Sequence, residues 1–176
     1  MLSFCNNLPN FISLLRLLLS PLMLYMDQRF LPYLFSFLAL TDALDGFLAR
    51  SLKKETQLGR VLDPLADKVF LITALFLCVF KLNLLNPILF FSLLARDSFI
   101  LFGSLLLLLK LRSIPKPSLW GKITTLVISL SLFICMIYSS YPLNLFLYVL
   151  SQFFVLISWI DYTVKGLKAL KSQTSF

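Results

Sequence analysis

Residues 41–68 read TDALDGFLARSLKKETQLGRVLDPLADK, a polar stretch between two apolar blocks. We expect two helices here, joined by a loop around residues 51–58. Positions 42, 45, 46 and 49 have the i, i+3, i+4, i+7 spacing of one helix face, and positions 59, 63 and 67 repeat every four residues. Each face therefore combines two aspartates with residues that have almost no side chain. These residues are Asp42, Asp45, Gly46 and Ala49 in the first helix, and Gly59, Asp63, Ala66 and Asp67 in the second.

The four aspartates predict a metal site if the two helices form an antiparallel pair. Carboxylates this close cannot all stay ionised in a medium of low dielectric unless cations join them, and hard oxygen ligands suit Mg²⁺ or Mn²⁺ rather than zinc. Asp67 lies about 12 Å along its helix from Gly59, which places the site near a membrane interface. The alternative is that the aspartates cap helices or pair with Arg50, Arg60 and Lys68, which accounts for one or two acids but not for two matching faces.

The composition predicts an all-α integral membrane protein. Of the 176 residues 59% are hydrophobic and 14% are charged, and the mean hydropathy is +0.90, which is too apolar for a soluble domain. A crossing takes about 20 helical residues, so the chain has room for a bundle of about six transmembrane helices, in a single domain over residues 1–176. We expect the spans within residues 8–26, 30–41, 59–81, 86–109, 119–138 and 143–160. For residues 171–176 disorder is the default.

The residue types that are missing narrow the possible chemistry. The chain has no histidine, so a His-ligated zinc site, a Ser-His-Asp triad and an imidazole base are excluded. The three cysteines, Cys5, Cys78 and Cys135, are far apart in apolar sequence, which favours small buried residues over a disulfide or a metal cluster. Catalysis, if present, rests on carboxylates, cations and hydroxyls.

The basic residues predict the orientation in the membrane. They gather in the connections around residues 50–60 and 110–116 and after residue 160, whereas the alternate connections hold only Arg29, only Lys81, or none. We therefore expect both termini and the two basic connections at the cytoplasmic face, where they also meet anionic lipid headgroups. Nucleic-acid binding is the rival explanation for the net charge of +8, but the cations are spread over short loops, so we expect no nucleic-acid partner.

The complete acidic pattern resembles the signature of the CDP-alcohol phosphotransferases. It reads Asp42-x2-Asp45-Gly46-x2-Ala49-Arg50-x8-Gly59-x3-Asp63-x3-Asp67. The resemblance implies a six-helix membrane fold, usually a homodimer, that displaces CMP from a CDP-linked substrate with an alcohol and uses Mg²⁺ or Mn²⁺. It further implies that Asp42, Asp45, Asp63 and Asp67 are metal ligands and that Asp67 is also the catalytic base. Gly46, Ala49 and Gly59 would give the cytidine diphosphate close access, and Arg50 would support its phosphates or the acidic cluster.

The amino-terminal residues resemble one branch of this family. Residues 7–16, NLPNFISLLR, are similar to the corresponding pattern of bacterial phosphatidylglycerophosphate synthases, which attach glycerol 3-phosphate to CDP-diacylglycerol. The resemblance implies that Asn10 and Ser13 lie near the nucleotide, with Ser13 standing where threonine is usual. Arg16 fits an inward-facing role, because a lone arginine facing lipid is costly; snorkelling to the interface is the alternative.

Two further segments resemble the same branch and suggest where an acceptor binds. Arg96-Asp97 is similar to an Arg-Glu pair of the branch, and residues 121–125 are similar to its Gly-Lys-x-x-Thr motif. An acceptor that carries a phosphate needs cations beyond the metals. The candidates for glycerol 3-phosphate binding are Arg96, Lys116, Lys122 and Thr125. Alternatively, Arg96 and Asp97 only neutralise each other within the bundle.

We therefore expect an enzyme of phospholipid biosynthesis. It would transfer the phosphatidyl group of CDP-diacylglycerol to glycerol 3-phosphate and release CMP. The alternatives are a CDP-dependent cardiolipin synthase, which uses phosphatidylglycerol as acceptor, and the phosphatidylinositol-phosphate and phosphatidylserine synthases. A divalent-cation transporter is more remote, because it needs a polar route and residues 30–40 and 69–80 are nearly all apolar.

Overall fold

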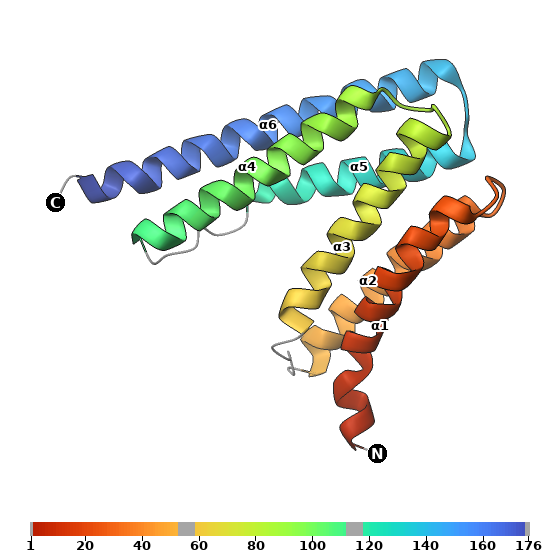
Figure 1. The fold of residues 1–176 in the computed structure, drawn as a ribbon, viewed down its shortest axis with the longest axis horizontal. Coiled ribbons are helices and arrows are strands. Elements are labelled where there is room, and N and C mark those ends of the chain that lie inside the picture. Colours follow the sequence, from red (N-terminus) through yellow and green to blue (C-terminus); the bar gives the residue numbers. More distant parts are fainter. Residues whose placement is uncertain (1, 53–58, 112–117, 175–176) are drawn as a thin grey trace. The chain divides into compact units, whose positions relative to one another are not determined.

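The computed structural model describes residues 2–52, 59–111 and 118–174, with side chains for residues 11–41, 62–106 and 118–168. The regular structure of these parts is helical, which confirms the all-α prediction (Figure 1). The chain divides into two compact units, Met1–Leu82 and Asn83–Phe176. The α-helices are α1 (Leu2–Leu22), α2 (Leu31–Leu52), α3 (Gly59–Phe76), α4 (Pro87–Leu111), α5 (Leu119–Ile137) and α6 (Tyr141–Thr174).

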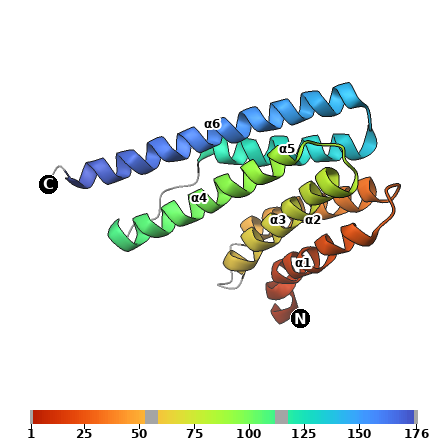
Figure 2. The same cartoon turned by 45° about the horizontal axis from the view of Figure 1, so that its top comes forward.

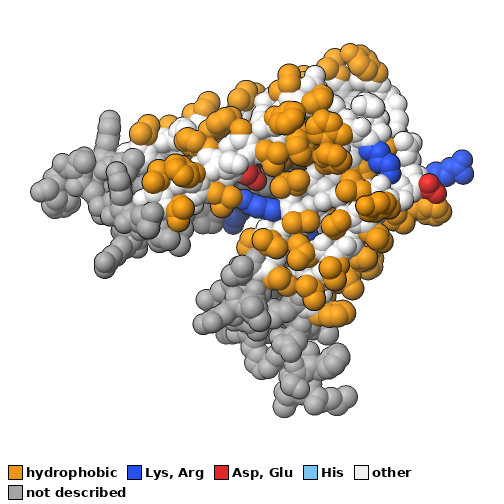
Figure 3. Space-filling model, in the orientation of Figure 1, with side chains coloured by type: hydrophobic (Ala, Val, Ile, Leu, Met, Phe, Trp, Pro, Cys, Tyr) orange, Lys and Arg blue, Asp and Glu red, His pale blue; other side chains and the backbone are white. Residues whose placement is uncertain are grey.

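The surface of the described helices is that of a membrane protein. Hydrophobic side chains cover much of the face that Figure 3 shows, and side chains such as Leu18, Phe102 and Leu126 are more than half exposed. Three described segments are long and apolar enough to cross a bilayer, namely Pro87–Leu106, Leu119–Ile137 and Tyr141–Lys168. Phe11–Tyr25 and Leu31–Thr41 are shorter apolar helices. In lipid this exposure carries none of the free-energy penalty that it would have in water.

The first unit is organised around α1, which packs against both α2 and α3. On α3, Ala66, Phe70 and Ala74 repeat every four residues and form a buried row. The two alanines are fully buried, and such small residues let the backbones of membrane helices approach closely. Phe70 meets Phe35 of α2, with 4.9 Å between the ring centroids.

Lys81 forms hydrogen bonds between the end of α3 and the segment that follows α1. It lies at the end of a π-helical turn, Leu77–Lys81, that continues α3. Its Nζ donates to the carbonyl oxygens of Leu24 at 2.6 Å and Met26 at 3.4 Å, in and just after the 3₁₀ turn that follows α1. Because the last carbonyls of a helix have no partner within it, a lysine is a suitable cap there. Lys81, the only basic residue expected in the connection between the third and fourth spans, thus has a structural role.

In the second unit α6 packs against both α4 and α5 (Figure 2). Small polar side chains join the helices: Ser151 donates to Ser131 at 3.1 Å, and Thr124 donates to the backbone oxygen of Phe154 at 3.0 Å. Ser92 of α4 similarly donates to Gln152 of α6 at 2.9 Å. Hydrogen bonds of this kind hold helices together where both lipid and protein are apolar.

The predicted end of the last helix was wrong. We expected the span to end at residue 160 and residues 171–176 to be disordered, whereas α6 runs to Thr174 and has 34 residues; residues 175–176 lie outside the described residues. A crossing needs about 20 residues, so α6 is longer than the hydrocarbon core requires. Hydropathy marks the end of the apolar segment and not the end of the helix, which continues past an Asp161–Lys165 ion pair at i, i+4.

Candidate functional site

Two polar side chains of α1 bind the two carboxylates of α3. Ser13 Oγ donates to Asp63 Oδ1 at 2.5 Å, and Arg16 Nη2 lies 3.0 Å from Asp67 Oδ1. Ser13 and Arg16 are about one turn apart on α1, as are Asp63 and Asp67 on α3, so two successive turns of the two helices are in register. The Arg16 side chain is 0% exposed, which confirms the inward-facing interpretation and excludes snorkelling.

In this arrangement each carboxylate of α3 has a donor on one oxygen. A carboxylate has two oxygens and about four lone-pair positions, so it can bind a donor and a cation at the same time. The Asp67 side chain is 52% exposed and therefore accessible, whereas Ser13, which binds Asp63, is fully buried. We expected Ser13 near a nucleotide, and the structure shows that its hydroxyl hydrogen points to a predicted metal ligand.

The other half of the predicted acidic site falls outside the described side chains. The backbone confirms the helical spacing, because α2 continues to Leu52 and α3 begins at Gly59. Within residues whose side chains are described, no three acidic, cysteine or histidine residues gather into a metal-binding group. The convergence of four carboxylates therefore stays a prediction. The predicted residues without a described side chain are Asn10, Asp42, Asp45, Gly46, Ala49, Arg50 and Gly59, and Lys116 lies outside the described residues altogether.

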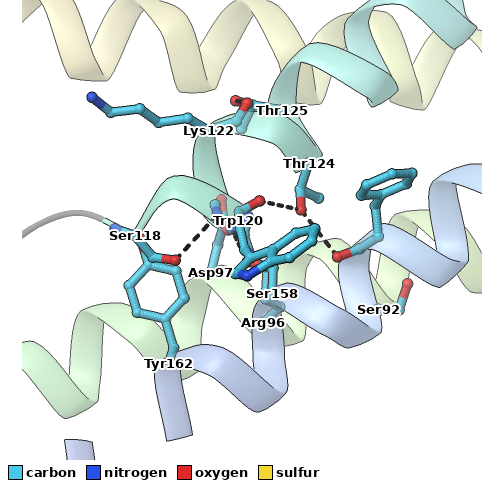
Figure 4. A network of polar contacts seen from close by, with 12 residues as sticks. Ser92, Arg96, Asp97, Ser118, Trp120, Lys122, Thr124, Thr125, Ser158 and Tyr162 are labelled. Atoms are coloured by element: carbon cyan, nitrogen blue, oxygen red, sulfur yellow. Dashed lines mark hydrogen bonds and ion pairs between the residues drawn. The ribbon is translucent and has the colours of Figure 1, made fainter. Parts of the chain in front are cut away.

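The second unit holds a buried arginine. The Arg96 side chain is 4% exposed, its Nη1 lies 2.9 Å from Asp97 Oδ1, and its Nη2 donates to Ser158 Oγ of α6 at 2.7 Å (Figure 4). Its guanidinium lies over the ring of Tyr162, 5.8 Å from the centroid. The ion pair between Arg96 and Asp97 is thus present, as expected if the two residues only neutralise each other. Ser158 and Tyr162 also contact Arg96, so the ion pair is only part of its environment.

The beginning of α5 is tied to α6 next to this arginine. Ser118 is the N-cap of α5 and accepts a hydrogen bond from the backbone nitrogen of Gly121 at 3.5 Å. Its hydroxyl donates to Asp161 Oδ2, and its backbone nitrogen donates to the Tyr162 hydroxyl at 3.2 Å. Asp161 in turn pairs with Lys165 at 2.7 Å.

Lys122 and Thr125 lie on an exposed face of α5. The Thr125 hydroxyl donates to the backbone oxygen of Lys122 at 2.9 Å. Figure 4 shows the Lys122 side chain extending away from Arg96. Of the predicted acceptor residues, the structure thus leaves Lys122 and Thr125 accessible and encloses Arg96 between helices.

Comparison with known proteins agrees with the acidic pattern. A sequence profile described as CDP-alcohol phosphatidyltransferase matches residues 6–164, which is most of the chain. The chain belongs to the CDP-alcohol phosphatidyltransferase family. Membership in an enzyme family contradicts the cation-transporter alternative.

Several relatives of this CDP-alcohol phosphatidyltransferase share one name. A CDP-diacylglycerol--glycerol-3-phosphate 3-phosphatidyltransferase of Aquifex aeolicus is 45% identical over 175 residues, covering 93% of this chain and 98% of that protein. One of the same name from Pseudomonas fluorescens is 44% identical over 82 residues, covering 42% of this chain and 41% of that protein. A rat cardiolipin synthase (CMP-forming) is 32% identical over 120 residues, covering 65% of this chain and 39% of that protein.

Sequence reasoning missed several polar residues of this CDP-alcohol phosphatidyltransferase. The serine before the apolar run of α5 is an N-cap signal, and an aspartate four residues before a lysine is an ion-pair signal on a helix. No local pattern indicates the other two, because their partners lie on other helices. The missed residues are Ser118, Ser158, Asp161 and Tyr162.

Proposed function

We propose that this protein transfers the phosphatidyl group of CDP-diacylglycerol to glycerol 3-phosphate, giving phosphatidylglycerol phosphate and CMP. The observation that carries the proposal is the row of carboxylates on α3, Asp63 and Asp67, held from α1 by Ser13 and Arg16. The name and nearly full-length similarity of the Aquifex aeolicus relative support the choice of substrates.

The donor set fits a divalent cation. Asp63 and Asp67 offer hard carboxylate oxygens, which suit Mg²⁺ or Mn²⁺, and the exposed Asp67 leaves an approach to the pair. We propose that Asp42 and Asp45 complete the ligand set with them. When bound, the metal would neutralise charge on the diphosphate and stabilise the departing CMP.

Asp67 is the proposed general base. Its carboxylate would accept the proton of the glycerol hydroxyl as that oxygen attacks phosphorus, which requires the hydroxyl within about 3 Å. The buried Arg16 holds Oδ1 at 3.0 Å and so orients the carboxylate. The residues proposed to line the nucleotide are Asn10, Ser13, Gly46, Ala49, Arg50 and Gly59.

The acceptor phosphate is proposed to bind at the beginning of α5. Lys122 is exposed there and is free to move towards an anion, and Thr125 supplies a hydroxyl beside it. Arg96 adds positive charge close to the same turn, because its Nη2 lies 3.2 Å from the position that a Cβ atom on Gly121 would take. Lys116 is the remaining candidate.

We also propose a location and an assembly. The distribution of lysine and arginine supports six spans with both termini and the two basic connections at the cytoplasmic face of a bacterial membrane. This would put the acidic helices α2 and α3 at the side where soluble glycerol 3-phosphate is available. A homodimer of single-domain chains is the assembly that the family resemblance implies.

A second candidate function is cardiolipin synthesis from CDP-diacylglycerol and phosphatidylglycerol. The similarity to the rat cardiolipin synthase over 65% of this chain favours it. The two functions share the donor and differ in the acceptor, so the acceptor decides between them.

The test is CMP release by the purified protein in detergent with CDP-diacylglycerol and Mg²⁺. Glycerol 3-phosphate, phosphatidylglycerol, inositol 1-phosphate and serine are compared as acceptors, with EDTA and with Asp67→Asn as controls. Release that requires both glycerol 3-phosphate and metal supports the proposal. Release with another acceptor alone would refute it while leaving the family assignment intact.

A further inference from the structure

Tyr162 of α6 contacts both of the helices on which the proposed acceptor site is built. Its hydroxyl oxygen accepts a hydrogen bond from the backbone nitrogen of Ser118, the N-cap of α5, at 3.2 Å. Its ring lies under the guanidinium of Arg96 of α4, at 5.8 Å from the centroid. One side chain thereby joins the start of α5 to a buried cation (Figure 4).

Gly121 shows how closely these groups fit. A Cβ atom added to Gly121 would lie 2.8 Å from the Tyr162 hydroxyl oxygen, 3.1 Å from a ring carbon of the same tyrosine and 3.2 Å from Arg96 Nη2. Real Cβ atoms essentially never approach another atom as closely as 2.8 Å, and contacts of 3.1–3.2 Å are tighter than usual, so a larger residue would displace the tyrosine first. The absence of a side chain at this position lets Tyr162 and Arg96 reach the first turn of α5.

The environment of Arg96 depends on this tyrosine. The Arg96 Nε atom is buried and makes no hydrogen bond to any described residue. A buried cation needs compensation, which the negative face of an aromatic ring supplies in part. Asp97 and Ser158 bind the terminal nitrogens, and the Tyr162 ring lies against the guanidinium, 5.8 Å from its centroid to the central carbon.

We infer that Tyr162 is a positioning residue for the acceptor. It sets the first turn of α5 and the guanidinium of Arg96 relative to each other, and thereby the place where Lys122 meets the phosphate of glycerol 3-phosphate. This inference rests on the proposed function. Because Tyr162 contacts α4 and α5, its loss affects the KM for the acceptor and leaves the KM for CDP-diacylglycerol unchanged.

The first test separates the hydroxyl from the ring. Tyr162→Phe removes the hydrogen bond to Ser118 and keeps the ring under Arg96, and we expect the KM for glycerol 3-phosphate to rise about fivefold. Tyr162→Leu removes both contacts, and we expect a rise of about thirtyfold. The KM for CDP-diacylglycerol stays within twofold of the parent in both. Tyr148→Phe, a hydroxyl deletion elsewhere on α6, is the matched control and leaves both constants unchanged.

The second test is a double-mutant cycle with Gly121→Ala. The added methyl group meets the Tyr162 hydroxyl first, so Tyr162→Phe relieves the closest contact. We expect Gly121→Ala to raise the acceptor KM by a smaller factor in the Tyr162→Phe background than in the parent protein. A merely structural role would change the KM for CDP-diacylglycerol and the KM for glycerol 3-phosphate together, whereas the inference predicts coupling in the acceptor KM alone.

The outcomes distinguish this inference from the proposed function. If the parent protein does not use glycerol 3-phosphate, the proposed function fails and the inference fails with it. If the parent uses it, but the tyrosine variants change both KM values equally, change neither, or show no coupling to Gly121→Ala, only the inference is overturned. Size-exclusion profiles and unfolding temperatures in detergent confirm that the variants compared are folded.

Discussion

Replacing Ser13 with alanine should weaken the binding of the proposed divalent cation. The Ser13 hydroxyl is fully buried and donates to Asp63 Oδ1 at 2.5 Å. Alanine removes the donor without adding bulk, so Asp63 keeps its charge and loses the group that orients it. Residues that orient metal ligands typically contribute a factor of about 10–100 to metal affinity.

For Ser13 the structure indicates an effect on metal affinity near the lower end of that range. A hydrogen bond to a charged group contributes about 1.5–3 kcal/mol, and the half-buried position of Asp63 lets water replace part of it. A loss of about 1–2 kcal/mol corresponds to metal binding that is about 5- to 30-fold weaker, since about 1.4 kcal/mol is tenfold.

The measurement is a Mg²⁺ titration of CMP release, together with Mn²⁺ binding followed by electron paramagnetic resonance without substrates. Ser13→Thr keeps the hydroxyl and should stay within twofold of the parent protein. Ser20→Ala is the matched control, because its buried hydroxyl donates within α1 to the backbone oxygen of Arg16 at 2.6 Å. Metal affinity of Ser13→Ala equal to that of the parent in both assays would refute the reasoning.

Three further changes test other parts of the molecule. Asp67→Asn should lower turnover by about 100-fold or more while the protein stays inserted and monodisperse; activity within twofold of the parent would rule out its proposed role as base. Lys122→Ala should raise the KM for glycerol 3-phosphate roughly tenfold and that for CDP-diacylglycerol little, with Lys168→Ala as the control; an effect on the lipid alone would contradict the acceptor site. Lys81→Met leaves two backbone carbonyls without their donor and should destabilise the protein by about 1 kcal/mol, seen as a lower unfolding temperature at unchanged turnover; an unchanged unfolding temperature would show that the cap is not stabilising.

The helices were predictable where an apolar segment has polar residues at both ends. The predicted span at residues 119–138 is close to α5 (Leu119–Ile137), and that at residues 86–109 is close to α4 (Pro87–Leu111). A helix is the only open-ended structure that satisfies its own backbone in lipid, so segment length nearly decides the outcome there. The end of α6 was not predictable in this way, because beyond the apolar segment the helix is supported by the Asp161–Lys165 ion pair and not by hydropathy.

The sequence by itself determined the helical membrane fold, the family and the acidic positions on α2 and α3, because hydropathy and spacing along one helix are local properties. Only the tertiary structure decided which side chains meet across helices. It paired Ser13 with Asp63 and Arg16 with Asp67, although about 50 residues separate the members of each pair in the chain. It also buried Arg96 between helices, with its guanidinium over the ring of Tyr162. Such contacts depend on the register between helices, which the packing of small and large side chains sets and which no single segment encodes.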